Sequence, residues 1–219
     1  MLGVGAKGRV WGRAVMMAVM LGLAAIVARP VEALAANDVQ LVVAKAQPRG
    51  SVYLFLGLLN VFSTGLDMLS DELKAKGITN TAMSYAGWTG PAADIEKRWA
   101  KDKARTRPIV LVGHSFGADA AMAMAAHLGR DGIPVDLVVI FDATAHWPVT
   151  SNVRHLINFY GSTDGVGKKL SPGPGFKGKL ENINLDKLHE AIDHLNIEKQ
   201  PSFHQRVIRE VLALYGRRS

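Results

Sequence analysis

The stretch that decides the fold runs from residue 107 to residue 121 and reads RPIVLVGHSFGADAA. Five apolar residues, mostly β-branched, lead into Gly-His-Ser-Phe-Gly at 113–117, and a helical pattern rich in Ala and Met follows at once. This order predicts a buried strand, a tight turn with Ser115 at its apex, and then a helix. The glycines two residues before and two residues after the serine allow the neighbouring backbone to pack closely.

The turn resembles the nucleophile elbow of the α/β-hydrolases, in which a strained strand-to-helix turn pushes a serine hydroxyl out of the sheet. A five-residue motif is weak evidence by itself, so its surroundings have to decide. Here the required strand precedes the motif and the required helix follows it. The resemblance implies that Ser115 is a nucleophile, and the alternative is a glycine-rich turn without chemistry.

Strand and helix patterns alternate along the rest of the chain. We expect strands at 51–59, 79–85, 109–115, 135–141, 155–160 and 179–185, and helices at 65–76, 92–105, 116–128 and 201–215. Unbroken apolar strands between helices predict the α/β class, with a doubly wound, mostly parallel sheet. The resemblance implies a small α/β-hydrolase fold without a separate lid domain, and we expect the loop 161–179 to cover part of the site. We expect the apolar face of the terminal helix to point toward the core, with Phe203, Val207, Ile208, Val211 and Leu212 on it.

Residues 1–35 read as a signal peptide. Basic residues precede an uncharged apolar run at 14–28, and Ala33-Leu34-Ala35 offers a cleavage site. Because the run is shorter than the roughly 20 residues of a membrane span, we expect no stable span after cleavage, with an uncleaved anchor as the alternative. The absence of cysteine favours a bacterial periplasmic or secreted protein. We expect residues 36–219 to form a single domain.

The charge pattern and two further motifs exclude several kinds of partner. The formal net charge is +7, but the basic residues form no stripe with interleaved aromatic residues, so we expect no nucleic acid partner. Residues 162–169 imitate a phosphate-binding loop but lack its first glycine and its final Ser or Thr. His189 and His194 are five residues apart, which on a helix turns them about 140° from each other. We therefore expect no cofactor and no metal; the sequence does not specify an oligomeric state.

A serine nucleophile needs a base within hydrogen-bond reach and a group that orients that base. His194 is the predicted base, because it lies between the last strand and the terminal helix, where the superfamily carries its catalytic histidine. Asp142 ends the strand 135–141 and is the favoured orienting acid, since a strand end holds a side chain more rigidly than a glycine-rich loop does. Asp164, after the next strand, is the alternative. We expect His114 to point away from the serine and to have a packing role.

The resemblance also implies two backbone donors for the oxyanion. One is the N–H of Phe116, directly after the serine, and the other is the N–H of Leu58, in the loop after the first strong strand. The His-Gly-Gly-Gly motif of lipases is absent from that loop. The segment Phe141-Asp142-Ala143-Thr144, with Pro148, Asn152 and Val153 after it, resembles exported bacterial thioesterase- or lipase-like hydrolases.

The leading hypothesis is a serine hydrolase that cleaves carboxylic esters or thioesters through an acyl-enzyme. Its substrate would be a small-molecule or lipid ester, and export argues against acyl-CoA. The alternatives are a non-catalytic exported envelope or binding protein on the same fold, and an acyltransferase with the same triad. The distance between His194 and Ser115 discriminates between a catalytic and a non-catalytic protein.

Overall fold

The computed structural model describes residues 49–58, 64–161, 165–186 and 192–216. The predicted signal peptide at 1–35, Asp164 and His189 lie outside the described residues.

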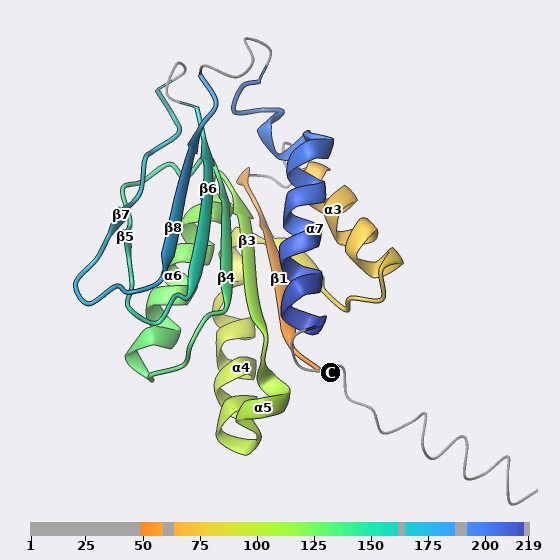
Figure 1. Ribbon diagram of the computed structural model, residues 1–219, viewed down its shortest axis with the longest axis vertical. Coiled ribbons are helices and arrows are strands. Elements are labelled where there is room, and N and C mark those ends of the chain that lie inside the picture. Colours follow the sequence, from red (N-terminus) through yellow and green to blue (C-terminus); the bar gives the residue numbers. More distant parts are fainter. Residues whose placement is uncertain (1–48, 59–63, 162–164, 187–191, 217–219) are drawn as a thin grey trace, which may run out of the picture. The chain divides into compact units, whose positions relative to one another are not determined.

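A six-stranded sheet forms the centre of the described chain, in the order β2-β1-β3-β4-β6-β8 (Figure 1). All neighbouring strands in it are parallel. The parallel, helix-covered sheet expected from the alternating pattern is therefore confirmed. Its strands are β1 (Ser51–Leu56), β2 (Thr81–Ser84), β3 (Ile109–His114), β4 (Leu137–Phe141), β6 (His155–Tyr160) and β8 (Lys179–Asn184).

Helices cover both faces of the sheet, as Figure 1 shows. On one face, α3 (Thr64–Ala75) and α7 (Pro201–Gly216) pack on an apolar cluster of alternate strand residues. On the other face, α4 (Thr89–Lys101) and α6 (Phe116–Arg130) pack on a second cluster. The helices on both faces explain why the four inner strands, β1, β3, β4 and β6, are nearly unbroken apolar runs: both of their faces are buried.

Three details differ from the predicted elements. The predicted helix 92–105 divides at Asp102, whose extended backbone ends α4 and whose carboxylate caps α5 (Lys103–Thr106). The predicted loop 161–179 contains a short strand, β7 (Ser171–Pro172), paired with β5 (Pro148–Val149). In α7, Leu212 is 37 % exposed, whereas His204 is buried.

None of the helices that the structure describes has both the length and the apolar character needed to cross a membrane.

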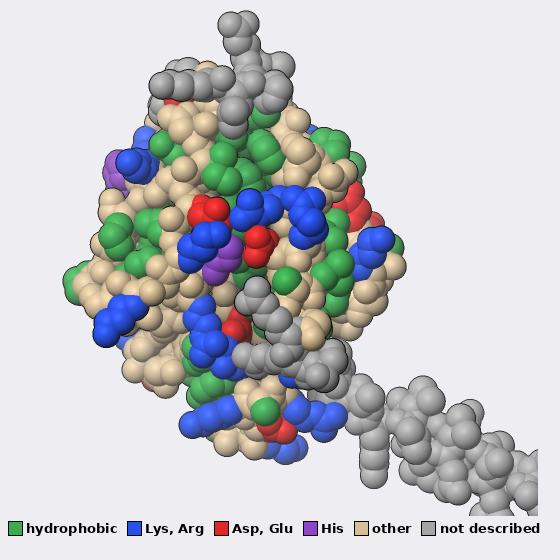
Figure 2. All heavy atoms as spheres, viewed as in Figure 1, with side chains coloured by type: hydrophobic (Ala, Val, Ile, Leu, Met, Phe, Trp, Pro, Cys, Tyr) green, Lys and Arg blue, Asp and Glu red, His purple; other side chains and the backbone are tan. Residues whose placement is uncertain are grey.

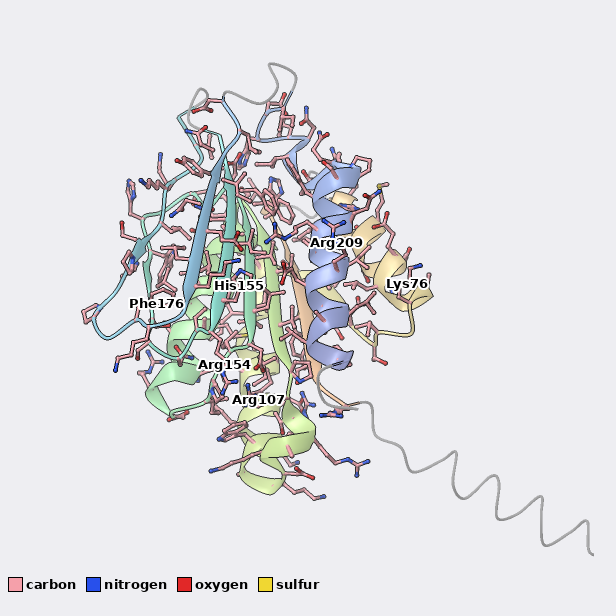
Figure 3. The ribbon with its side chains drawn as sticks, in the orientation of Figure 1. Lys76, Arg107, Arg154, His155, Phe176 and Arg209 are labelled. Atoms are coloured by element: carbon pink, nitrogen blue, oxygen red, sulfur yellow. The ribbon has the colours of Figure 1, made fainter. Side chains whose placement is uncertain are left out.

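A group of charged side chains lies at the amino ends of β4, β6 and β8, where Figure 2 shows basic, acidic and histidine side chains together. Figure 3 labels Arg107, Arg154 and His155 in this region. The Asp136 carboxylate accepts hydrogen bonds from Nε of Arg107 and from the backbone N–H of Ile109. A cavity of about 390 Å³ opens here. Its charges neutralise one another in ion pairs, and it is at the opposite ends of the strands from Ser115, so we assign it no catalytic role.

Two glycines explain why the turn around Ser115 can form. A Cβ built on Gly117 would overlap the carbonyl oxygen of Phe55 in β1, and one built on Gly113 would overlap the carbonyl oxygen of Gly117. The start of α6 therefore lies directly against β1 and β3. This close contact holds the serine at the carboxyl end of β3.

We expect Gly117→Ala to lower the free energy of unfolding by about 3 kcal/mol or more, because the added methyl meets backbone that cannot move aside. Gly90→Ala is the matched control, since a Cβ at Gly90 meets no atom within 4 Å. That variant should be unchanged or more stable by up to about 1 kcal/mol. Urea unfolding of both variants measures the difference, and equal stabilities would contradict the close packing of Gly117.

Candidate active site

Ser115 sits between the end of β3 and the first residue of α6. Its backbone has φ +58° and ψ −126°, a strained conformation for a residue with a side chain. The turn is held by the N–H of Ser115, which donates to the carbonyl of Phe141 at 3.0 Å. The side chain is not sealed off: the residue is 8 % exposed and lines a pocket. The sequence pattern and the backbone geometry thus agree on a strained serine at a strand-to-helix turn.

The structure brings Ser115, His194 and Asp142 together in one line. Nε2 of His194 is 3.0 Å from Oγ of Ser115, and Nδ1 of His194 is 3.3 Å from Oδ2 of Asp142. A carboxylate can only accept, so Nδ1 carries the proton that it donates to Asp142. In the neutral ring Nε2 then carries no proton and can accept the serine proton.

Asp142 is fixed more firmly than a surface carboxylate. Its backbone has φ +50°, its N–H donates to the carbonyl of Phe159 at 3.0 Å, and it is 1 % exposed. The second carboxylate oxygen accepts the N–H of Gly161 at 2.8 Å. Gly167 approaches so closely that a Cβ there would overlap this oxygen. Hydrogen bonds to β6 and from the segment directly after it therefore hold the carboxylate toward His194.

The expectation for His114 was wrong in one respect. The His114 side chain does not point away from the serine. It lines the pocket that holds Ser115, and its ring centroid is 4.9 Å from that of His194. Burial lowers the pKa of His114 to about 4, although its bond to the backbone of His194 acts in the opposite direction. The ring is therefore neutral at pH 7, and its Nε2–H donates to the carbonyl of His194 at 2.8 Å.

The pocket around Ser115 has a volume of about 290 Å³. Both residues predicted to supply oxyanion donors, Leu58 and Phe116, line it. Phe116 is the first residue of α6, where backbone N–H groups have no partner within the helix and the helix dipole is positive. This end of α6 suits a negative charge beside Ser115.

Exposed apolar side chains gather at this pocket. Leu58, Phe116 and Leu195 are 45 %, 42 % and 52 % exposed, and all three line it. The remaining large apolar side chains found exposed among the described residues are Met68 and Leu212, which do not line it. The three pocket residues are called the apolar rim below.

Asp119 is a site-supporting residue that the sequence analysis missed. It accepts hydrogen bonds from the Thr144 hydroxyl, from the N–H of Ala145 at 3.2 Å and from Nε1 of Trp147 at 2.8 Å. These bonds tie the segment after Asp142 to the first turn of α6. An acidic residue one turn after the serine was the available signal, but a favourable helix-dipole contact accounts for it equally well.

One group of described residues has the composition of a metal site. Glu96, His127 and Asp131 bring three potential ligand atoms within 4.8 Å of one another. The two ring nitrogens of His127 already contact Glu96 at 2.7 Å and Arg130 at 2.5 Å. The guanidinium of Arg130 at Nδ1 of His127 places a positive charge beside the group and disfavours a bound cation, so we assign no metal to this group.

Comparison with known proteins places the site in context. Residues 99–158, which include Ser115 and Asp142, match the family model of the Thioesterase domain. No curated protein matches the chain. Among solved structures, the esterase domain of a Rhodothermus marinus protein is 17 % identical, with a TM-score of 0.44 over 80 % of this chain and 88 % of that one. A hydrolase of the alpha/beta superfamily from Xanthomonas campestris is 15 % identical, with a TM-score of 0.40 over 77 % and 99 %. Both likenesses are remote.

Proposed function

We propose that this chain is a serine hydrolase of the α/β-hydrolase superfamily that cleaves esters through an acyl-enzyme. The match of residues 99–158 to the Thioesterase domain supports ester or thioester hydrolysis in the broad sense. The observation that carries the finer proposal is the line of hydrogen-bonding atoms from Ser115 through His194 to Asp142, with 3.0 Å and 3.3 Å between them.

Each of these groups has a defined role in the proposed reaction. Ser115 Oγ attacks the carbonyl carbon while Nε2 of His194 takes its proton, and Asp142 stabilises the imidazolium that forms. The oxygen of the tetrahedral intermediate is stabilised by the N–H groups of Phe116 and Leu58. The leaving alcohol or thiol receives the proton from His194. Water then gives a proton to His194 and attacks the acyl-enzyme, which releases the carboxylic acid and restores the serine.

The non-catalytic alternative is not favoured: a His194 beyond hydrogen-bond reach of Ser115 would have supported it, and Nε2 is 3.0 Å from Oγ. In an acyltransferase an alcohol would replace the water in the second step. Analysis of the products in the presence of an added alcohol separates transfer from hydrolysis.

We further propose that the substrate has an apolar acyl or alcohol group. The support is the apolar rim: three exposed apolar side chains surround the pocket that holds Ser115. Water-exposed apolar surface is costly, and its burial by a substrate contributes about 0.8 kcal/mol per methylene. A small pocket with such a rim fits one end of an extended chain better than a large polar substrate.

We expect kcat/KM for p-nitrophenyl esters to rise about fourfold per methylene from acetate to butyrate, as burial of the chain on the rim predicts. Leu195→Asn should flatten this rise and leave the acetate rate nearly unchanged. Leu212→Asn is the matched control, because Leu212 is exposed but lies on α7 and does not line the pocket. A chain-length series that is flat in the wild type, or flattened equally by both variants, would rule out the apolar rim as the acyl site.

We also propose that the chain is exported. The support is the basic, apolar and Ala-x-Ala pattern of residues 1–35. Export would favour an oxygen ester over acyl-CoA. Mass spectrometry of the protein recovered from a secreting bacterial host tests this: a new amino terminus near Ala36 is expected, and an intact Met1–Ala35 segment on cytoplasmic protein contradicts it.

A further inference from the structure

Glu198 is a buried acidic residue for which the proposed reaction has no use. It is fully buried, and Oε2 has no hydrogen-bond partner among the described residues. Oε1 accepts the backbone N–H of Gly65 at 3.4 Å and lies 4.0 Å from Nζ of Lys199. An incompletely satisfied buried carboxyl is uncommon in folded proteins and calls for a reason.

Glu198 joins two parts of the chain that are 133 residues apart. Gly65 is in the first turn of α3, whose N–H groups have no partner within the helix. The Glu198 side chain supplies an acceptor for one of them, so it caps α3 from a distant segment. The backbones also touch, since a Cβ on Gly65 would overlap the carbonyl oxygen of Glu198.

A second helix holds Glu198 from another direction. His204 in α7 is buried, and its Nε2 donates to the carbonyl of Glu198 at 2.6 Å. The other ring nitrogen of His204 lies 3.0 Å from a carboxylate oxygen of Glu72 in α3. Glu198 is therefore fixed between α3 and α7, and its position depends on both helices.

Glu198 lies four positions after His194, and the chain between them forms one compact turn. The N–H of Ile197 donates to the carbonyl of Asp193 at 3.0 Å, and Nζ of Lys199 donates to the carbonyl of Leu195 at 2.8 Å. Ile197 is itself 1 % exposed. Because the turn is bonded internally, a displacement of Glu198 moves the backbone that carries His194.

We propose that Glu198 is a positioning residue: by capping α3 at Gly65, it fixes the position of the turn that carries His194. The inference rests on the proposed function. Burial raises the pKa of Glu198 to about 7, although nearby hydrogen bonds and the charge of Lys199 lower it. Both the neutral and the ionised carboxyl keep an oxygen that accepts the Gly65 N–H, so the cap persists across this pH range.

Three variants test the proposal in the full chain. Glu198→Ala removes the acceptor, Glu198→Gln keeps it, and Gly65→Ala forces the two backbones apart. Since a displacement of about 1 Å can cost about 100-fold in rate, we expect Glu198→Ala and Gly65→Ala to lower kcat by about 10- to 100-fold with KM nearly unchanged. The kcat of Glu198→Gln should stay within about threefold of the wild-type value, because the amide oxygen can still accept the Gly65 N–H. Gly90→Ala serves again as the control for an added methyl.

A second measurement does not depend on activity. The proton NMR signal of the His194 Nδ1 proton can be assigned by its absence in His194→Gln. We expect this signal in the wild type and in Glu198→Gln, and we expect it to be lost in Glu198→Ala. Thermal melting shows whether each variant is folded. Full kcat and an unchanged signal in Glu198→Ala overturn the proposal, and so does a Gln variant that behaves like the Ala variant. If the wild type hydrolyses no ester, the proposed function fails, and the NMR signal still decides the role of Glu198.

Discussion

Ser115→Ala is expected to lower kcat/KM for p-nitrophenyl esters by a factor on the order of 10⁴ to 10⁶, as loss of a serine nucleophile does in other hydrolases. The substitution removes the oxygen that lies 3.0 Å from Nε2 of His194. The only other hydroxyl among the described residues that line the pocket belongs to Thr144, and it donates to Asp119. Rate above the uncatalysed level should remain, because the backbone donors and the pocket are untouched.

The fold should survive this change. Alanine carries the same Cβ as serine, so the strain at φ +58° is unaltered. A fluorophosphonate probe should label the wild type at Ser115, located by peptide mass spectrometry, and should leave Ser115→Ala unlabelled. Ser151→Ala is the matched control, because Ser151 is exposed and lies in a turn. Labelling at another residue, or a rate loss below about tenfold, would exclude Ser115 as the nucleophile.

Asp142→Asn is expected to lower kcat by about 10²- to 10⁴-fold with little change in KM, since an amide no longer enforces the productive tautomer of the base. In the wild type the carboxylate accepts the Nδ1 proton of His194, so Nε2 carries no proton and can accept from the serine. Asparagine can turn its NH₂ group toward Nδ1, and the ring proton then moves to Nε2. The other oxygen can still accept the N–H of Gly161, so the variant should fold.

Asp164→Asn is the matched control for this experiment, because Asp164 follows the next strand and is the alternative acid. It should retain at least about half of the wild-type kcat, as expected for a substitution outside the hydrogen-bonded line. Circular dichroism melting of both variants separates misfolding from a catalytic defect. An active Asp142→Asn together with an inactive Asp164→Asn would transfer the orienting role to Asp164.

The strand-to-helix turn at Ser115 could be predicted because its causes are local. Apolar runs, glycines and a helical pattern within 107–121 each favour one backbone conformation, and tertiary contacts then reinforce it. The same holds for the parallel sheet, since both faces of its inner strands β1, β3, β4 and β6 are apolar. The division of the predicted helix at Asp102 was missed, because a capping aspartate and a solvent-facing helical aspartate look alike in sequence.

The partners of His194 depend on contacts across the fold. Asp142 was favoured over Asp164 by the rigidity of a strand end, and the structure places Asp142 against His194. His114, in contrast, was expected to face away, yet it supports the backbone of His194. Alternation along a strand tells which face a side chain takes, but it does not tell which distant loop returns over that face.

The sequence by itself determined the strained serine, the parallel sheet and the position of the histidine before the terminal helix, because these follow from patterns within a few residues. The tertiary structure alone decided which groups meet that histidine: Ser115 at 79 residues' separation, Asp142 at 52 and His114 at 80. It also decided that Glu198 reaches Gly65 across 133 residues. Such contacts are set by how the crossovers bring strand ends and helix ends to one edge of the sheet, and no local pattern encodes that arrangement.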